Sequence, residues 1–238
     1  MIISPRDGRI VRLAGRFGQV STNQIRMLEF SQNKAKSRTN DVLARLVQSG
    51  LLRKVEPRRT VGGWAGGSGQ YVYQVGAKGW QYLRRDGKYS PMRSIDMHGL
   101  AIVDTYVTTV GLERSGAIRI NEVLSEPECH QIVAGVLITP DLYINADLLA
   151  TQTRRRVWVE VDMGTERRKQ ITDKLARYRH AYRAWADERP GQPFPRVVFV
   201  AIDEEREREL RTIISEMPES GRKLFGVCQG ESFVQVWG

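Results

Sequence analysis

The sequence predicts an α/β chain, α+β overall, in which a basic helical domain precedes a larger domain built on a mixed sheet. Two observations carry this prediction. Residues 1–88 hold 17 lysines and arginines against 5 acidic residues, whereas the whole chain has a net charge of +10. The first region also shows helical periodicity followed by two short strands, while the rest alternates apolar strands with helices. We therefore predict domains at 1–88 and 91–238, with Ser90-Pro91 at their border.

Composition excludes several classes of protein. The chain has 238 residues, 41% hydrophobic and 27% charged, which is typical of a globular protein with a real core. No apolar run approaches the ~18 residues of a membrane span, and the first residues lack the apolar stretch of a secretory signal. Two cysteines are too few for a disulfide framework or an ordinary zinc site. We expect a cytoplasmic protein that does not bind membranes.

The N-terminal region predicts three helices. Apolar spacing favours the first over Arg6–Phe17. A Ser or Thr cap at Ser21-Thr22 begins the second, which runs to Phe30. The third extends from about Lys34 to Ser49, where Gly50 is a typical C-terminal stop.

A basic hairpin should follow these helices. Leu51–Val55 and Tyr71–Val75 have the composition of strands, and a loop rich in glycine and arginine joins them over 57–69. The segment Gly76–Leu83 resembles the strand-then-helix end of many bacterial regulators. Three helices and a basic hairpin in this order predict a winged helix.

Double-stranded DNA is the partner that this domain favours. The third helix would enter the major groove and the wing would contact the backbone or minor groove, because their side chains are cationic or short and polar. Trihelical cores also serve as protein-interaction modules, but the charge asymmetry favours DNA. The candidate DNA-contacting residues are Lys34, Lys36, Ser37, Arg38, Thr39, Asn40, Arg58 and Arg59.

The C-terminal region predicts a mixed sheet covered by helices. A mostly apolar helix over 92–110 carries His98, either as a core residue or as a contact to a metal site or scissile phosphate. Later helices are expected over 166–187, capped by Thr165, and over 204–217. The expected strands are Ala117–Ile120, Gly135–Ile138, Leu142–Ile144, Arg155–Asp162, Pro195–Asp203, Lys223–Cys228 and Phe233–Trp237.

Acidic residues in this sheet suggest a metal-binding or catalytic site. Asp141 follows a proline, and the strand that ends at Asp162 carries Trp158, Glu160 and Asp162 on one face. Two carboxylates flanked by apolar residues are costly unless something positive lies between them. A divalent metal ion is one candidate. The alternative is a half-exposed strand whose acids face water or pair with arginines.

The following helix supplies a lysine. Gln170, Lys174 and Tyr178 form one row along the edge of its apolar stripe. We expect Lys174 to lie near the sheet, where its ammonium group could meet Glu160 and Asp162. In the alternative, the lysine extends past the apolar surface to solvent.

Pro140-Asp141 together with Glu160-Val161-Asp162 resembles the PD-(D/E)XK, or restriction-endonuclease-like, nuclease pattern. The resemblance implies that Asp141 and Glu160 bind Mg²⁺ if the site is active. Asp162 stands where the family has its lysine. The resemblance therefore implies that Lys174 takes the role of that lysine. Asp162 would then be either a third metal ligand or the partner of Lys174. Gln170 and Tyr178 would match accessory residues that some nuclease branches carry on this helix.

A closer resemblance is to the replication-relaxation family of plasmids, phages and other mobile elements. It rests on the segments 159–166 and 174–178 after a Pro-Asp and a winged helix. Two functions follow from this resemblance. In the first, a winged helix delivers a Mg²⁺-dependent nuclease to DNA. In the second, the protein is a sequence-specific transcriptional regulator whose inactive nuclease-like domain is a scaffold or forms a homodimer.

Overall fold

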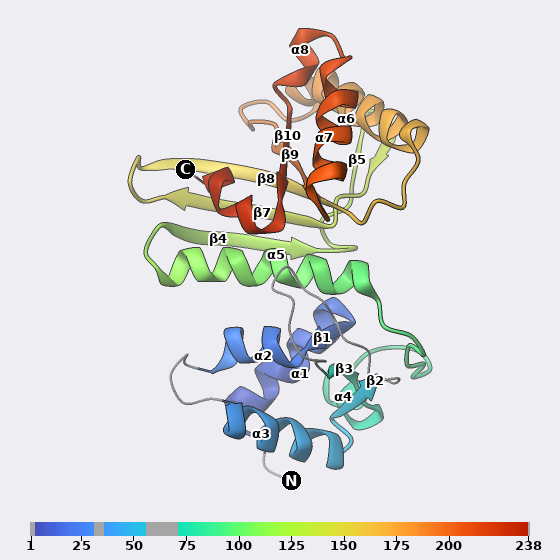
Figure 1. Cartoon of the computed structure of the whole chain (residues 1–238), viewed down its shortest axis with the longest axis vertical. Coiled ribbons are helices and arrows are strands. Elements are labelled where there is room, and N and C mark those ends of the chain that lie inside the picture. The colour runs from blue at the N-terminus through green and yellow to red at the C-terminus, as the bar shows by residue number, and fades with distance from the viewer. Residues whose placement is uncertain (1–2, 31–35, 56–70, 238) are drawn as a thin grey trace. The chain divides into compact units, whose positions relative to one another are not determined.

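The computed structural model describes residues 3–30, 36–55 and 71–237 (Figure 1). The chain divides into two compact units, Met1–Val107 and Thr108–Gly238. The first unit therefore takes in residues 91–107, which the sequence places with the second domain. The predicted border between folding domains stays a prediction. Among the described residues, no helix combines the length and the apolar character needed to cross a bilayer.

The first unit combines short helices with a three-stranded antiparallel sheet of order β1-β3-β2. The loop that the sequence predicts as a wing falls on residues outside the described ranges. The prediction missed the short strand before the second helix. The elements are α1 (Pro5–Phe17), β1 (Gln19–Ser21), α2 (Thr22–Glu29), α3 (Lys36–Gln48), β2 (Leu52–Val55), β3 (Val72–Val75) and α4 (Ala77–Tyr82).

Polar contacts fix the ends of these helices. Ser4 and Asp7 form a capping box at the start of α1, and Ser21 caps α2 as predicted. Two nitrogens of the Arg45 guanidinium lie 2.7 and 3.1 Å from the Asp7 carboxylate, which joins α3 to α1. Burial would raise the pKa of Asp7, but the hydrogen bonds from Arg45 and Ser4 hold it below its ordinary value.

The sequence predicts a helix from about residue 92, but helix α5 (Met97–Arg114) begins only at Met97. The preceding residues are held in the first unit by hydrogen bonds instead: Gln19 Nε2 donates to Ser94 O at 2.8 Å, and the Asp96 N–H donates to Gln19 Oε1 at 2.9 Å. The Asp96 carboxylate accepts the Gly99 N–H at 3.0 Å and so caps the helix. These side-chain contacts outweigh the apolar periodicity of residues 92–96.

The second unit is built on a five-stranded mixed sheet of order β10-β9-β8-β7-β4. β4, β7 and β8 are antiparallel neighbours, whereas β8, β9 and β10 run parallel. Helix α6 links β8 to β9, and α7 and α8 link β9 to β10, as parallel pairing requires. The elements are β4 (Ile118–Ser125), β7 (Leu142–Leu148), β8 (Thr153–Asp162), α6 (Arg168–Glu188), β9 (Arg196–Ala201), α7 (Glu204–Ser215), α8 (Glu219–Arg222) and β10 (Phe225–Gln229).

Aromatic side chains fill the core between this sheet and α6. Trp158 of β8 is fully buried, and its ring centroid lies 5.7 Å from that of Tyr178 and 5.6 Å from that of Trp185, both on α6. A small hairpin, β5 (Gln131–Val133) and β6 (Val136–Ile138), packs on the same helix. The sequence predicts the second strand of this hairpin but not the first.

The expected closing strand at Phe233–Trp237 is wrong. These residues belong to a 3₁₀ helix, η1 (Gly230–Trp237). Phe233 and Trp237 are both buried, with ring centroids 6.3 Å apart. In an extended strand, residues four positions apart are separated by about 13 Å along the chain, whereas the shorter rise of a 3₁₀ helix lets these two rings meet.

Candidate functional site

Asp141 and Glu160 come together across neighbouring antiparallel strands. The register pairs Leu142 with Val159, which places Asp141 at the start of β7 beside the end of β8. The Asp141 N–H donates to Val159 O at 2.9 Å, and its Oδ2 accepts the Val161 N–H at 2.6 Å. Asp141 is 7% exposed and Glu160 is 3% exposed, so both carboxyl groups are buried.

The carboxylate of Glu160 receives two donors from α6. Lys174 Nζ lies 2.9 Å from Oε2, and the Tyr178 hydroxyl donates a short hydrogen bond to Oε1. Burial raises the pKa of Glu160 to about 7 although Lys174 lowers it, and the nearby charge of Asp141 adds to the rise. Burial and the charge of Glu160 also raise the pKa of Tyr178 well above its ordinary value, so its phenol stays a donor.

Lys174 bridges two carboxylates. Besides Glu160, its ammonium nitrogen lies 3.1 Å from Glu166 Oε1 in the loop before α6. Burial alone would lower the pKa of Lys174, but the two carboxylates raise it above its ordinary value. The group is therefore a fixed cation at the edge of the sheet, as the helical row of Lys174 and Tyr178 predicted.

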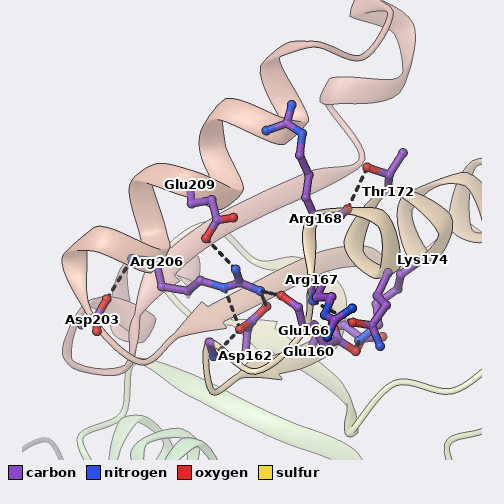
Figure 2. Close-up of polar contacts among 12 residues, drawn as sticks. Glu160, Asp162, Glu166, Arg167, Arg168, Thr172, Lys174, Asp203, Arg206 and Glu209 are labelled. Atoms are coloured by element: carbon purple, nitrogen blue, oxygen red, sulfur yellow. Dashed lines mark hydrogen bonds and ion pairs between the residues drawn. The ribbon is translucent and has the colours of Figure 1, made fainter.

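Asp162 has a different partner. Its two oxygens accept from Nε and Nη2 of Arg206 at 2.9 and 2.8 Å, and Oδ1 also accepts the Gly164 N–H at 2.7 Å (Figure 2). Of the two roles expected for Asp162, third metal ligand or partner of Lys174, the second is therefore wrong. Arginine matches a carboxylate with two parallel hydrogen bonds, which a lysine cannot supply.

Arg206 is the residue of this region that sequence reasoning missed. It lies in the first turn of α7 and also donates to Glu166 O at 2.8 Å and to Glu209 at 2.6 Å (Figure 2). No local sequence signal points to it, because the contact depends on the register of the sheet: Ala201, the last residue of β9 before α7, pairs with Asp162. The start of α7 therefore had to lie near the end of β8.

Two accessory candidates lie elsewhere. Gln170 is exposed, and its Oε1 accepts the Arg167 N–H at 2.7 Å at the start of α6. This contact corrects the predicted cap, since the helix begins after Arg167 rather than at Thr165. His98 lies half-buried on α5 within the first unit.

The candidate DNA-contacting residues divide into four groups. Ser37, Arg38 and Asn40 are exposed on α3. Thr39 is only 1% exposed, so its side chain packs inside the unit and cannot make the predicted contact with DNA. Lys36 begins the helix, and three candidates lie outside the described residues: Lys34, Arg58 and Arg59.

Asp141 and Glu160 form a pair of hard oxygen donors on neighbouring strands. Within the described ranges, no group of three or more His, Cys, Asp or Glu side chains is placed to hold a metal ion. Mg²⁺ often binds through one or two carboxylates and completes its shell with water and substrate phosphates. The pair fits such an ion if the Lys174 ammonium group moves away from Glu160 Oε2, which then becomes free to bind the metal.

Comparison with known proteins identifies the family. Residues 12–197 match the family described as replication-relaxation, so the chain belongs to the replication-relaxation family. This membership indicates a function in the replication or relaxation of mobile elements. No curated protein and no solved structure matches the chain.

Proposed function

We propose that the first unit is a winged helix that binds duplex DNA, with α3 as its recognition helix. The excess of basic residues over 1–88 is the observation that carries this proposal. Ser37, Arg38 and Asn40 support it, because they are exposed on the N-terminal half of α3. Arg45 and Asp7 hold this helix against α1, which leaves that exposed face available.

DNA binding can be tested by fluorescence anisotropy over a range of salt concentrations. Loss of a base-contacting arginine costs about 1–3 kcal/mol, so Arg38→Ala should weaken binding by roughly tenfold or more. Arg183→Ala, which removes an exposed arginine of α6, is the matched control. Equal affinities for the wild type and Arg38→Ala would reject α3 as the recognition helix.

We further propose that the second unit is a nuclease-like domain that hydrolyses DNA phosphodiesters with Mg²⁺. The contact of Lys174 with Glu160, beside Asp141 on the neighbouring strand, is the observation that carries this proposal. Asp141 and Glu160 would hold the ion, which supplies charge neutralisation and activates water when bound. Lys174 would stabilise the negative charge that develops on the phosphate.

A second candidate function is supported by the same contacts. Both carboxylate oxygens of Glu160 already accept hydrogen bonds, and Asp162 is paired with Arg206. A saturated buried network of this kind can stabilise a fold without chemistry. In this alternative the protein is a sequence-specific regulator whose nuclease-like domain is an inactive scaffold or forms a homodimer.

A plasmid nicking assay separates the two candidates. The wild type should nick supercoiled DNA with Mg²⁺ or Mn²⁺, and Glu160→Gln should lose at least tenfold in rate while it keeps its DNA affinity. Glu209→Gln is the control, since Glu209 contacts Arg206 but not Lys174 or Asp141. Tight DNA binding by the wild type without cleavage under any of these conditions would favour the regulator.

A further inference from the structure

A cavity of about 430 Å³ lies at the β10 edge of the large sheet. Its walls come from β9, β10, α7, the end of α8 and η1, so all of them belong to the second unit. Sites for small molecules commonly have volumes of roughly 300–1,000 Å³. None of the proposed nuclease residues lines this cavity.

Three arginines line the cavity: Arg196, Arg211 and Arg222. Arg211 is partly neutralised, because it pairs with Glu207 at 2.7 Å and also donates to Val227 O at 2.5 Å. Arg222 donates through Nε to Met217 O at 2.7 Å and, like Arg196, has no carboxylate within ion-pair distance in the described part of the chain. Two guanidinium groups are therefore available for an anion.

Gly226 allows one of these groups to lie close to the sheet. A Cβ at Gly226 would lie 3.3–3.5 Å from the guanidinium atoms of Arg196, so alanine there would shift the arginine by only a few tenths of an ångström, whereas the further methyl groups of valine would compete for its place. The glycine sits in β10, the edge strand. Arg196 is exposed, but its guanidinium group lies beside β10 at the cavity.

The remaining lining is mixed. Val236 supplies partly exposed apolar surface beside Ile214 and Val227, which are almost buried in the core, and Ser215 and Ser232 supply hydroxyl groups. Guanidinium groups match phosphate oxygens with paired hydrogen bonds, and apolar or aromatic side chains suit the face of a base. Such a lining fits a ligand with an anionic end and a flat, weakly polar body.

We propose that this cavity binds the phosphate of a nucleotide, with Arg196 and Arg222 as the phosphate contacts and the apolar wall beside the base. The nucleotide is either free or the 5′-phosphorylated end of a DNA strand, since both present the same group. The proposal does not depend on the nuclease activity proposed above. It assigns the second unit a contact with nucleotides separate from Asp141 and Glu160.

Calorimetric titration of the full chain with dAMP and with inorganic phosphate tests the free ligand. Titration with a short single-stranded oligonucleotide, carrying a 5′-phosphate or a 5′-hydroxyl, tests the strand end in an Arg38→Ala background. Arg196→Ala and Arg222→Ala should each weaken binding of the preferred ligand by about tenfold, as expected for loss of a charge-assisted contact. Gly226→Val should do the same by displacing Arg196.

Arg183→Ala is again the control, because it removes an equal charge from an exposed position of α6 outside the cavity. A thermal unfolding curve for each variant verifies that it is folded. The proposal is rejected if dAMP binds no better than inorganic phosphate and the 5′-phosphorylated oligonucleotide binds no better than the 5′-hydroxyl one. An equal loss with Arg183→Ala would also reject it, since it would indicate general attraction to charge.

Discussion

The ammonium group of Lys174 lies 2.9 Å from the carboxylate of Glu160, and both side chains are largely buried. Breaking such a pair by removing one partner typically costs about 3–5 kcal/mol. We expect Lys174→Met to lower the free energy of unfolding by that amount in urea titrations well above pH 7, where Glu160 is ionised. The double variant Glu160→Gln/Lys174→Met should lose less than the sum of the two single variants; additive losses would contradict a coupled pair.

The pKa of Glu160 predicts how stability depends on pH. Burial raises this pKa from an ordinary 4.5 to about 7, so the folded state binds a proton that the unfolded state releases. The resulting stabilisation is fully present below pH 4.5 and is lost as the pH rises to about 7. Urea unfolding across this window should show a smaller decline for Glu160→Gln than for the wild type. Parallel pH profiles would contradict the raised pKa.

Two glycines should respond oppositely to alanine. In α4, a Cβ at Gly79 would lie 2.1 Å from Leu51 O, a backbone atom that cannot easily move. In α5, a Cβ at Gly111 would meet nothing within 4 Å. Gly79→Ala should therefore destabilise the protein, whereas Gly111→Ala should stabilise it by about 0.5–1 kcal/mol through helix propensity. Thermal unfolding of both variants measures this difference, and a shift of the same sign for both would contradict it.

The two cysteines should resist alkylation in the folded protein. Burial raises the pKa of Cys129 and of Cys228 to about 12, and the charges of Glu126 and Glu207, respectively, add to it. The thiolate is the reactive form, so both residues should react with iodoacetamide far more slowly than in urea. Mass spectrometry after a timed reaction gives the modified fraction. Cys228 lines the arginine-lined cavity, so rapid labelling of Cys228 in the native protein would contradict the prediction and show that its sulfur is exposed there.

Local sequence predicted the contacts that one helix and one strand can specify. Residues one turn apart on α6 had to share a face, and Lys174 and Tyr178 do meet Glu160 there. The same reasoning could not pair Asp162 with Arg206, because that contact depends on the parallel register of β8 and β9. The two residues are brought together by the sheet and not by any local pattern.

The C-terminal segment and the start of α5 were harder to predict from the sequence for a related reason. Phe233–Trp237 has the composition of a strand, but it follows the edge strand β10 and forms a 3₁₀ helix instead. Helix α5 likewise begins late because Gln19, far away in sequence, binds Ser94 and Asp96. In both places the deciding interactions are tertiary, and propensity is a weak guide to them.

The Asp162–Arg206 pair also has a consequence for proteolysis. The segment that begins α6 offers trypsin three exposed basic residues, Arg167, Arg168 and Lys169. Cleavage requires local unfolding, but Arg206 holds the preceding loop through Glu166 O. Limited digestion should therefore spare these sites in the wild type and cut them in Arg206→Met. The buried Arg206 of α7 would then determine whether trypsin can cleave after the basic residues at the start of α6.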